Sequence, residues 1–312
     1  MLEQTITRHN HLIDPTVTVW GWEIPVYLFL GGLVAGMMVV SGYFLFSGRY
    51  RNKLSASLYL PGISLVLLTL GMLALFLDLE HKAYVWRLYT TFQISSPMSW
   101  GAWILLFVYP ALAANALIRP PKFFREHLDW ANELSNRLYE RKQAVKWVGA
   151  LNMLLGAMLG VYTGILLSTM ASRPLWNSAL LGPIFLASGM SGAAALIHMI
   201  ARDRRERELL AKADNGFIVA ELILIGLFLI GLVTSTEAHI RAAGLLLGGP
   251  YTAVFWVLVV GIGLVFPLIV QLLAVNHKIQ HTPVAPILVI AGGILLRFVI
   301  VYAGQVSGWN SF

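Results

Sequence analysis

The chain has 312 residues, of which 58% are hydrophobic and only 12% are charged, and its formal net charge is +7. Soluble domains carry roughly half hydrophobic and a quarter charged residues, so this composition is typical of a membrane protein. Cysteine is absent, which excludes disulfides, thiolate metal sites and Fe–S clusters held by this chain alone. The basic residues gather in links between apolar stretches, so the positive charge does not indicate nucleic-acid binding.

The chain begins with a polar segment and continues with eight apolar stretches. The first 22 residues carry charges and Pro15 and have no apolar core, so we do not interpret them as a cleaved signal peptide. Each later stretch has about 20 residues or slightly more, the length that a helix needs to cross a bilayer. The sequence predicts an all-α integral membrane protein with the spans Ile24–Phe46, Ser57–Leu77, Met98–Ile118, Val145–Met170, Leu175–Ile200, Phe217–His239, Tyr251–Val275 and Pro286–Ser307.

Two of the links between spans are predicted to be helical as well. In Glu80–Gln93, aromatic and leucine side chains are mixed with His81, Lys82 and Arg87, which is typical of a helix that lies in the membrane interface. Lys122–Lys142 is polar, with Phe, Trp and Leu at helical spacing, and this pattern favours a surface helix.

The distribution of Lys and Arg predicts the orientation of the spans. The segment before the first span and every second link after it carry five of these residues in total, whereas the other links carry sixteen. Basic residues favour the cytoplasmic side, so both termini are expected to face outward. The run Arg202–Arg207 is interpreted as part of this topology signal, with a site for anionic lipid as the alternative.

The two halves of the chain share a pattern. Phe29–Gly36 aligns with Phe185–Gly192 at an offset of 156 residues, and the same offset carries Trp20 onto Trp176. Small residues at these positions allow helices to approach closely in a membrane. The pattern predicts a parallel duplication into two four-helix bundles. The first bundle begins in residues 1–144 and is completed by the span at 145–170, and the second occupies residues 171–312.

Polar side chains gather near the outer ends of the spans. Each has an ordinary explanation, because Tyr and Trp are frequent at membrane interfaces and a carboxylate at the end of a span is often solvated. Tyr162 differs because it lies about two turns inside the membrane, where its hydroxyl needs a partner. An apolar cleft with a few convergent hydroxyl, carboxylate and imidazole groups suits a small amphipathic ligand. The polar residues concerned are Glu23, Tyr27, Asp78, Glu80, His81, Ser99, Trp100, Tyr162, Ser168, Thr169, Glu237, His239, Tyr302 and Gln305.

A full charge lies deep in the last span. Arg297 is near the middle of the apolar run Pro286–Gly308, and a guanidinium at the bilayer centre costs roughly 3 kcal/mol on insertion scales. Because Arg keeps its proton, we expect it to face the interior of the bundle in a polar network that includes water. By helical rise it is predicted to be closer in depth to Asp78 and Glu237 than to Glu221, which lies lower by roughly 10–15 Å.

Glu221 allows two interpretations. It lies about one turn inside its span, so it is either a carboxylate that reaches the interface or pairs with a loop, or a proton entry or relay site. Under the second interpretation, Glu237 and His239 near the outer face join it in a candidate proton path.

The histidines argue against a bound haem. A b-type haem between helices needs two axial imidazoles within the membrane, and only His198 and His239 lie in predicted spans, at opposite faces. The sequence also contains no nucleotide-binding loop, no nucleophile elbow and no spacing typical of a metal site. We therefore expect neither haem nor metal in this chain.

Several motifs follow one another from the first span to the last. They are Trp20–Gly36 (WGWEIPVYLFLGGLVAG), Asp78-Leu79 with Ser95–Trp103 (SSPMSWGAW), Tyr162–Gly164 leading to Arg173–Asn177, and Gly292–Arg297 with Ala303-Gly304. Their content and order resemble the NrfD/PsrC family, the membrane subunits of polysulfide reductase-like complexes. The resemblance covers the chain from the first predicted span to the eighth.

The resemblance implies eight helices in two bundles, no bound prosthetic group, and an exchangeable menaquinone or ubiquinone at the outer face. It also implies electron exchange with an Fe–S partner subunit outside, which serves a molybdenum-containing catalytic subunit or a multihaem cytochrome. The location would be the inner (cytoplasmic) membrane. The family's quinone site falls on Tyr27, with Glu23 beside it, and on Tyr162, and the family's arginine falls on Arg297. Some members have His at the position of Tyr27.

A quinol that releases two electrons also releases two protons, so hydroxyl and carboxylate groups near its ring would orient it and carry protons. We therefore assign quinone binding to Tyr27, Tyr162, Asp78 and His81, and catalytic roles to Asp78, Glu23 and Arg297. Two other classes of function stay open. A secondary transporter also has internal repeats, although its site is expected near the midplane. A plain membrane anchor of an extracytoplasmic complex needs neither Arg297 nor a buried Tyr162.

Overall fold

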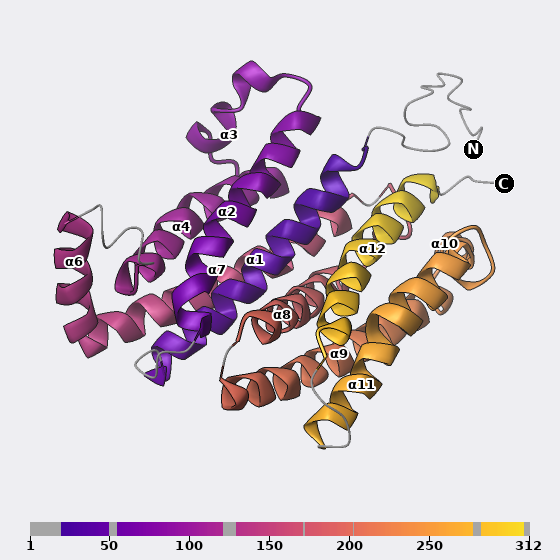
Figure 1. Ribbon diagram of the computed structural model, residues 1–312. Helices are drawn as coiled ribbons and strands as arrows, with labels where there is room; N and C mark the ends of the chain where they lie inside the picture. Colours follow the sequence, from indigo (N-terminus) through magenta and orange to yellow (C-terminus); the bar gives the residue numbers. More distant parts are fainter. Residues whose placement is uncertain are drawn as a thin grey trace.

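The computed structural model describes residues 20–49, 55–120, 129–170, 172–201, 203–276 and 282–308, and within these ranges it contains helices and no strand (Figure 1). Eight helices in this part of the chain are long and apolar enough to cross a membrane, which confirms the predicted number of spans. The elements are α1 (Glu23–Phe46), α2 (Ser55–Asp78), η2 (Lys82–Tyr84), α3 (Arg87–Thr90), α4 (Pro97–Ile118), α6 (Asp129–Glu140), α7 (Lys142–Ser168), α8 (Leu181–Ile200), α9 (Arg204–Val233), α10 (Glu237–Leu247), η3 (Val254–Val265), α11 (Phe266–Val275) and α12 (Val284–Val306).

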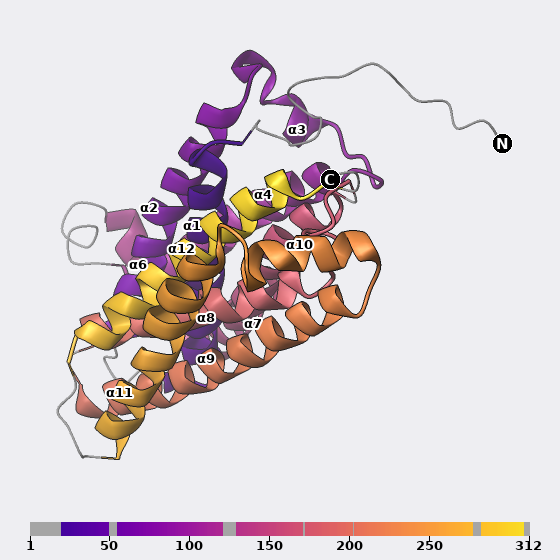
Figure 2. The ribbon, with the colours of Figure 1, turned by 90° about the vertical axis from the view of Figure 1, so that its right-hand side faces the viewer.

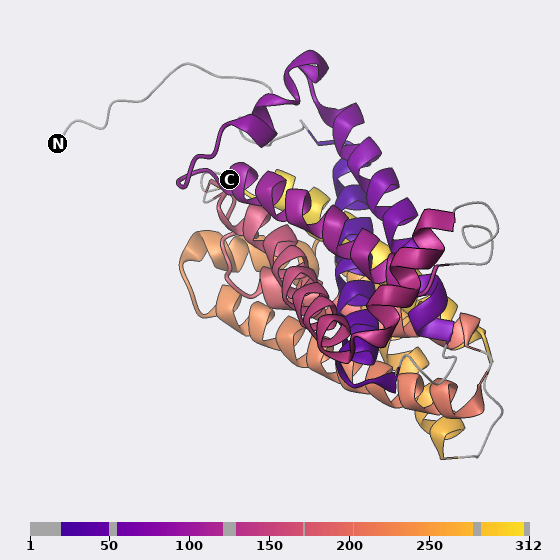
Figure 3. The same ribbon diagram turned by 90° about the vertical axis from the view of Figure 1, so that its left-hand side faces the viewer.

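Helix α1 is the centre of the molecule. It packs against α2 and α7 on one side and against α8 and α12 on the other. Where α1 crosses α8, glycines bring the two backbones into contact: a Cβ atom at Gly36 would overlap the carbonyl of Gly189, and one at Gly189 would overlap the carbonyl of Gly32. Close approach of this kind is how small residues stabilise helix pairs in membranes. Figure 3 views the molecule from the side of α4, α6 and α7, in magenta and pink.

The start of α1 and the end of α12 lie at the same face of the molecule (Figure 1). The Trp20 N–H donates to Gln305 Oε1 at 3.0 Å, and Gln305 Nε2 donates to the Trp20 carbonyl at 3.0 Å. The Trp20 ring also packs against Trp176, with ring centroids 5.2 Å apart. The sequence predicts that this face lies outside the cytoplasm, and that orientation stays a prediction.

The predicted interfacial helix Glu80–Gln93 is wrong as a continuous element. The structure has two short turns there, η2 and α3, and neither turn buries a residue, so no buried face favours one longer helix. The predicted surface helix Lys122–Lys142 is present as α6, and residues 122–128 lie outside the described ranges. The non-helical backbone of Arg141 (φ −84°, ψ 81°) separates α6 from α7.

The predicted span Phe217–His239 is wrong at both ends. Helix α9 begins thirteen residues earlier, at Arg204, where the Asp203 carboxylate caps it by accepting from the Arg205 N–H at 3.3 Å. It ends at Val233, because Thr234 turns its hydroxyl back onto the Ile230 carbonyl at 2.7 Å and the chain then extends. The segment beyond forms a separate helix, α10, which packs on α9 and α12 (Figure 2).

Two further spans differ from the expectation. The fifth begins at Leu181 rather than Leu175, because the chain turns at Trp176 and its buried indole donates to the Ile300 carbonyl of α12 at 2.8 Å. The seventh span is a π-helix in its first half, η3, where the Phe266 N–H bonds to the Gly261 carbonyl five residues back.

Candidate functional site

Three tyrosines converge on one cavity at the end of the molecule that holds Trp20 and Gln305. The cavity, here called the tyrosine cavity, has a volume of about 240 Å³. Tyr27 comes from α1, Tyr89 from α3 and Tyr162 from α7, and apolar side chains of α2 and α4 complete the wall. Tyr27 is 4% exposed and Tyr162 is 6% exposed. The hydroxyls of Tyr162 and Tyr89 are close enough to Tyr27 to interact with it electrostatically.

The position of the Tyr162 hydroxyl depends on Gly101 of α4. A Cβ atom at Gly101 would overlap the phenol oxygen, so only glycine leaves room for it. On α3, burial raises the pKa of Tyr89 and Tyr109 adds to the rise, so the Tyr89 hydroxyl is a protonated donor at neutral pH. The cavity therefore offers hydroxyl groups inside an otherwise apolar wall.

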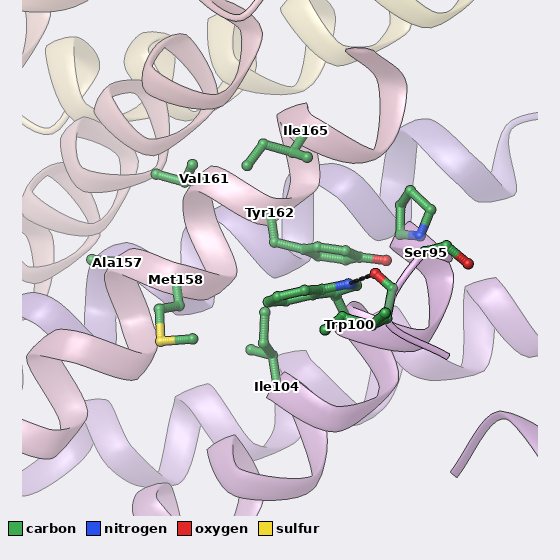
Figure 4. Close-up of a pocket in the computed structure, with 10 residues that line it drawn as sticks. Ser95, Trp100, Ile104, Ala157, Met158, Val161, Tyr162 and Ile165 are labelled. Carbon is green, nitrogen blue, oxygen red and sulfur yellow. Dashed lines mark hydrogen bonds between the residues drawn. The ribbon is translucent and has the colours of Figure 1, made fainter. Parts of the chain in front are cut away.

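Tyr162 also borders a second cavity, here called the lateral cavity, which opens between α4 and α7 and has a volume of about 500 Å³. Figure 4 shows the rings of Tyr162 and Trp100 lying beside each other at its edge, with Val161 and Ile165 on one side and Ala157 and Met158 further along α7. The Trp100 indole donates to the Ile94 carbonyl at 2.8 Å, which fixes the ring. The Tyr162 side chain therefore lines both cavities.

The outer carboxylates lie near the tyrosine cavity but do not line it. Asp78 is the last residue of α2, and the next residue, Leu79, is part of the cavity wall. Glu23, the first residue of α1, interacts electrostatically with Asp78, and both are partly exposed. His81 is exposed, with its ring edge-on to Tyr84 at 6.5 Å. Of the predicted quinone-binding residues, the structure places Tyr27 and Tyr162 in one cavity wall, and Asp78 and His81 outside it.

Arg297 faces the protein interior, as predicted, and is 1% exposed. Its guanidinium donates to the Ser188 hydroxyl at 2.6 Å and to the Phe185 carbonyl at 2.9 Å, and it lies 4.4 Å from the centre of the Phe185 ring. The expectation that Arg297 lies closer to Asp78 and Glu237 than to Glu221 is wrong. The carboxylate with which it interacts is Glu221, because the two packed helices α8 and α9 bring Ser188 and Glu221 together beside α12.

Comparison with known proteins places these features in a family. The model of the family described as Polysulphide reductase, NrfD matches residues 9–307. The chain belongs to the NrfD family. It is 30% identical to the C subunit of polysulfide reductase from Wolinella succinogenes over 307 residues, which cover 92% of this chain and 94% of that protein. It is 31% identical to the NrfD homolog of Haemophilus influenzae over 313 residues (93% and 95%) and 29% identical to NrfD of Escherichia coli over 311 residues (93% and 96%).

Membership of the NrfD family makes this protein a multi-pass membrane subunit of the polysulfide reductase type of oxidoreductase complex, and it confirms the resemblance found in the sequence. Within the described ranges, no group of three or more His, Cys, Asp or Glu side chains is placed to hold a metal ion.

The residues of the candidate proton path lie on two different helices. Glu221 is in α9 and 1% exposed, whereas Glu237 and His239 are in α10. Glu237 pairs with Arg241 at 2.8 Å and its side chain is 80% exposed, and His239 Nδ1 is 2.7 Å from the Thr236 hydroxyl. The expectation that the three share one span is wrong, and their part in proton transfer stays a prediction.

Sequence reasoning missed Asp214, a second buried carboxylate. It is 1% exposed and accepts from the Ser191 hydroxyl at 2.6 Å and from the Gln271 amide at 2.7 Å. The feature of the sequence that could have revealed Asp214 is its position seven residues before Glu221, because residues about two helical turns apart lie on the same side of a helix. Because the predicted span begins at Phe217, Asp214 falls in the link before it.

Proposed function

We propose that this NrfD-family chain binds menaquinone or ubiquinone in the tyrosine cavity and exchanges electrons with an Fe–S partner subunit at the same face. Through that subunit the electrons would pass to or from a molybdenum-containing catalytic subunit or a multihaem cytochrome. The observation that carries the proposal is that Tyr27 and Tyr162, on α1 and α7, line one buried cavity. An apolar cavity with a few placed polar groups is what a small amphipathic ligand needs.

The chemistry of the bound quinol is the release of two electrons together with two protons. The hydroxyls of Tyr27 and Tyr162 are placed to donate hydrogen bonds to ring oxygens and so to hold the ring in one orientation. Asp78 and Glu23, at the adjoining ends of α2 and α1, are placed to accept protons and pass them to solvent, because both are partly exposed. His81 on the following turn is a further proton acceptor near that exit.

The lateral cavity supports the same proposal. Its lining is almost entirely apolar, and it lies between the two helices that carry Gly101 and Tyr162. An isoprenoid tail is apolar and needs a path from the lipid to the ring site. We therefore assign the lateral cavity to the tail or to the entry of the ligand.

The proposal includes an arrangement in the membrane. Residues 1–170 and 171–312 form two four-helix bundles related by a parallel repeat, both termini face outward, and the partner subunits dock on the outer face of the cytoplasmic membrane. Trp20 and Gln305 are hydrogen-bonded to each other, which supports the placement of both termini on one side of the membrane. The packing of α1 against α8 supports an interface between the two bundles at the centre of the molecule.

Purification of the chain with its neighbouring subunits tests this function. We expect the preparation to show Fe–S absorption and to oxidise a short-chain quinol such as menadiol. A secondary transporter would purify without Fe–S absorption. A plain anchor would bring Fe–S absorption with it, but substitution of Tyr162 would leave quinol oxidation unchanged.

A further inference from the structure

A polar pocket opens on the side of the molecule away from the tyrosine cavity. It lies where the last turn of α8, the first turns of α9 and the start of α12 meet. Since Gln305, near the end of α12, bonds Trp20, the start of that helix lies at the opposite end of the molecule (Figure 1). The pocket has a volume of about 240 Å³, and we call it the basic pocket. The described residues that line it are His198, Met199, Arg207, Thr282, Pro283 and Pro286.

Arg207 of α9 supplies a positive charge that is held at the wall of this pocket. Its Nε donates to the carbonyl of Ala201, just after α8, at 2.7 Å. Among the described residues this is the only hydrogen bond that the Arg207 side chain makes, so both terminal nitrogens are available to a ligand. A guanidinium presents its nitrogens as a planar fork, and the fork matches two oxygens of a phosphate or a carboxylate.

The start of α12 and His198 add further groups that favour an anion. Pro283 is the N-cap residue of α12 and has no side-chain acceptor, and the first turn carries no acidic residue. Neither the cap nor a carboxylate of the first turn therefore offsets the positive end of the helix dipole, which stabilises bound anions. His198, in the last turn of α8, lines the same pocket, and an imidazole N–H is a further donor.

The acidic residues near the start of α9 do not take part in the pocket. Asp203, Glu206 and Glu208 belong to the same stretch as Arg207, but none of them is among the described residues that line the pocket. The Asp203 carboxylate instead accepts from the Arg205 N–H at 3.3 Å and so caps α9. The charged and polar groups that face the pocket are therefore those that recognise an anion.

Apolar side chains beside the pocket indicate that this anion belongs to a lipid. Met199 lines the pocket and is 41% exposed. Ile287 is 50% exposed and lies four residues after Pro283, on the same side of α12. On helices that span a membrane, exposed apolar side chains of this kind contact lipid tails. Pockets that enclose a drug-sized ligand have volumes of roughly 300–1,000 Å³, so the smaller basic pocket suits a headgroup whose acyl chains stay outside.

We propose that the basic pocket binds the phosphate of an anionic phospholipid, with the acyl chains lying along Met199 and Ile287. Arg207 is the principal donor to the phosphate oxygens. The pocket lies at the end of the molecule that the distribution of Lys and Arg predicts to be cytoplasmic, where anionic lipids attract basic segments. The bound lipid joins the ends of α8, α9 and α12, and its role is separate from quinone binding at the other end.

The test is the binding of phosphatidylglycerol to the delipidated complex in detergent, measured by native mass spectrometry. We expect the wild-type complex to bind phosphatidylglycerol more tightly than phosphatidylcholine, whose headgroup has no net charge. Arg207→Gln should weaken phosphatidylglycerol binding about tenfold or more, because a hydrogen bond to a charged group contributes at least that factor. Arg205→Gln removes the same charge from an exposed residue of the same helical turn that does not line the pocket, so it should leave binding unchanged.

A second pair of variants keeps the bond between Arg207 and the Ala201 carbonyl. Met199→Glu places a carboxylate at the mouth of the pocket and should weaken phosphatidylglycerol binding by repulsion. Met199→Gln makes the same position polar without a charge, so it should bind the lipid nearly as the wild type does. If Arg207→Gln does not assemble, this pair decides the question.

Wild-type affinity in Arg207→Gln, or in Met199→Glu where Arg207→Gln does not assemble, would overturn the proposal. An equal loss in Arg205→Gln would also overturn it, because attraction by overall charge would then account for the binding. Equal affinity for phosphatidylcholine would remove the preference for an anionic lipid and with it the proposal. Inorganic phosphate distinguishes a lipid from the free ion: at millimolar concentration it should not displace phosphatidylglycerol, and displacement would overturn the assignment to a lipid.

Discussion

The phenol oxygen of Tyr162 lies directly over the backbone of Gly101, in the space that a methyl group at position 101 would fill. Two helices therefore contribute to one contact: α4 leaves the space beside Gly101 empty, and α7 places the Tyr162 hydroxyl in it. This relationship gives a way to move the hydroxyl without removing it.

Gly101→Ala should displace the Tyr162 ring and lower quinol oxidation about tenfold or more, because a misplaced positioning group loses much of its effect. Alanine favours a helix over glycine, so α4 itself should persist. The measurement is menadiol oxidation by the purified complex, with the amount of assembled chain determined in parallel. Gly62→Ala on α2, where a Cβ atom would meet nothing within 4 Å, is the control for adding a methyl group at a helical glycine. Normal activity in Gly101→Ala would show that the Tyr162 hydroxyl has no positioning role.

Tyr162→Phe removes only the hydroxyl, so the chain should fold and quinol oxidation should fall by about an order of magnitude or more. Tyr27→Phe should act in the same direction with a smaller effect. Tyr43→Phe is a matched control, because Tyr43 is 44% exposed at the other end of α1. Wild-type quinol kinetics in both Tyr27→Phe and Tyr162→Phe would contradict the assignment of the site.

Asp78→Asn keeps the shape of the side chain and removes a proton acceptor. We expect an assembled complex whose quinol oxidation is slow across the pH range. Glu23→Gln should act in the same direction, and the effect of the two changes together should differ from the sum of the single effects because the two carboxylates interact. Glu80→Gln, an exposed neighbour, should leave the rate unchanged. Full activity of Asp78→Asn at every pH would rule out its role in proton release.

Arg297→Leu leaves the buried Glu221 carboxylate without its guanidinium, and breaking a buried pair typically costs about 3 kcal/mol or more. The double variant Arg297→Leu/Glu221→Leu removes both charges and should unfold at a higher temperature than the single variant. Thermal unfolding of the detergent-solubilised complex measures the difference. A double variant that is less stable than Arg297→Leu would show that the two residues do not form a pair.

Much of the architecture can be predicted from the sequence, because the thickness of a bilayer determines how long an apolar run must be to cross it as a helix. The sequence predicts eight spans, and eight long apolar helices are present in the described residues. The boundaries that failed depend on contacts from other helices. Asp214 is a charged residue and so lies outside the predicted span, but Ser191 of α8 and Gln271 of α11 satisfy it inside the protein. Such partners are far away in the sequence, so a one-dimensional pattern does not reveal them.

Only part of the candidate site can be predicted from the sequence, as was the case for the spans. Tyr162 stands out because a hydroxyl two turns inside a span needs a partner, and the structure places it with Tyr27 in one cavity. The partner itself, Gly101, escapes sequence reasoning, because a missing side chain gives no polar signal. The predicted depth of Arg297 comes from counting residues along each span separately, as if every helix were straight. The close packing of α8, α9 and α12 instead brings Glu221 to it through Ser188.

The central claim is that quinone binds in the tyrosine cavity, and photolabelling tests it most directly. An azido-substituted quinone is bound to the purified complex, activated by light, and the modified peptides are identified by mass spectrometry. The account predicts labelling of α4 around Met98–Leu105 and of α7 around Tyr162–Leu166, suppressed by excess menadione and reduced in Tyr162→Phe. Labelling confined to α9, α10 or α12, with none on α4 or α7, would contradict it.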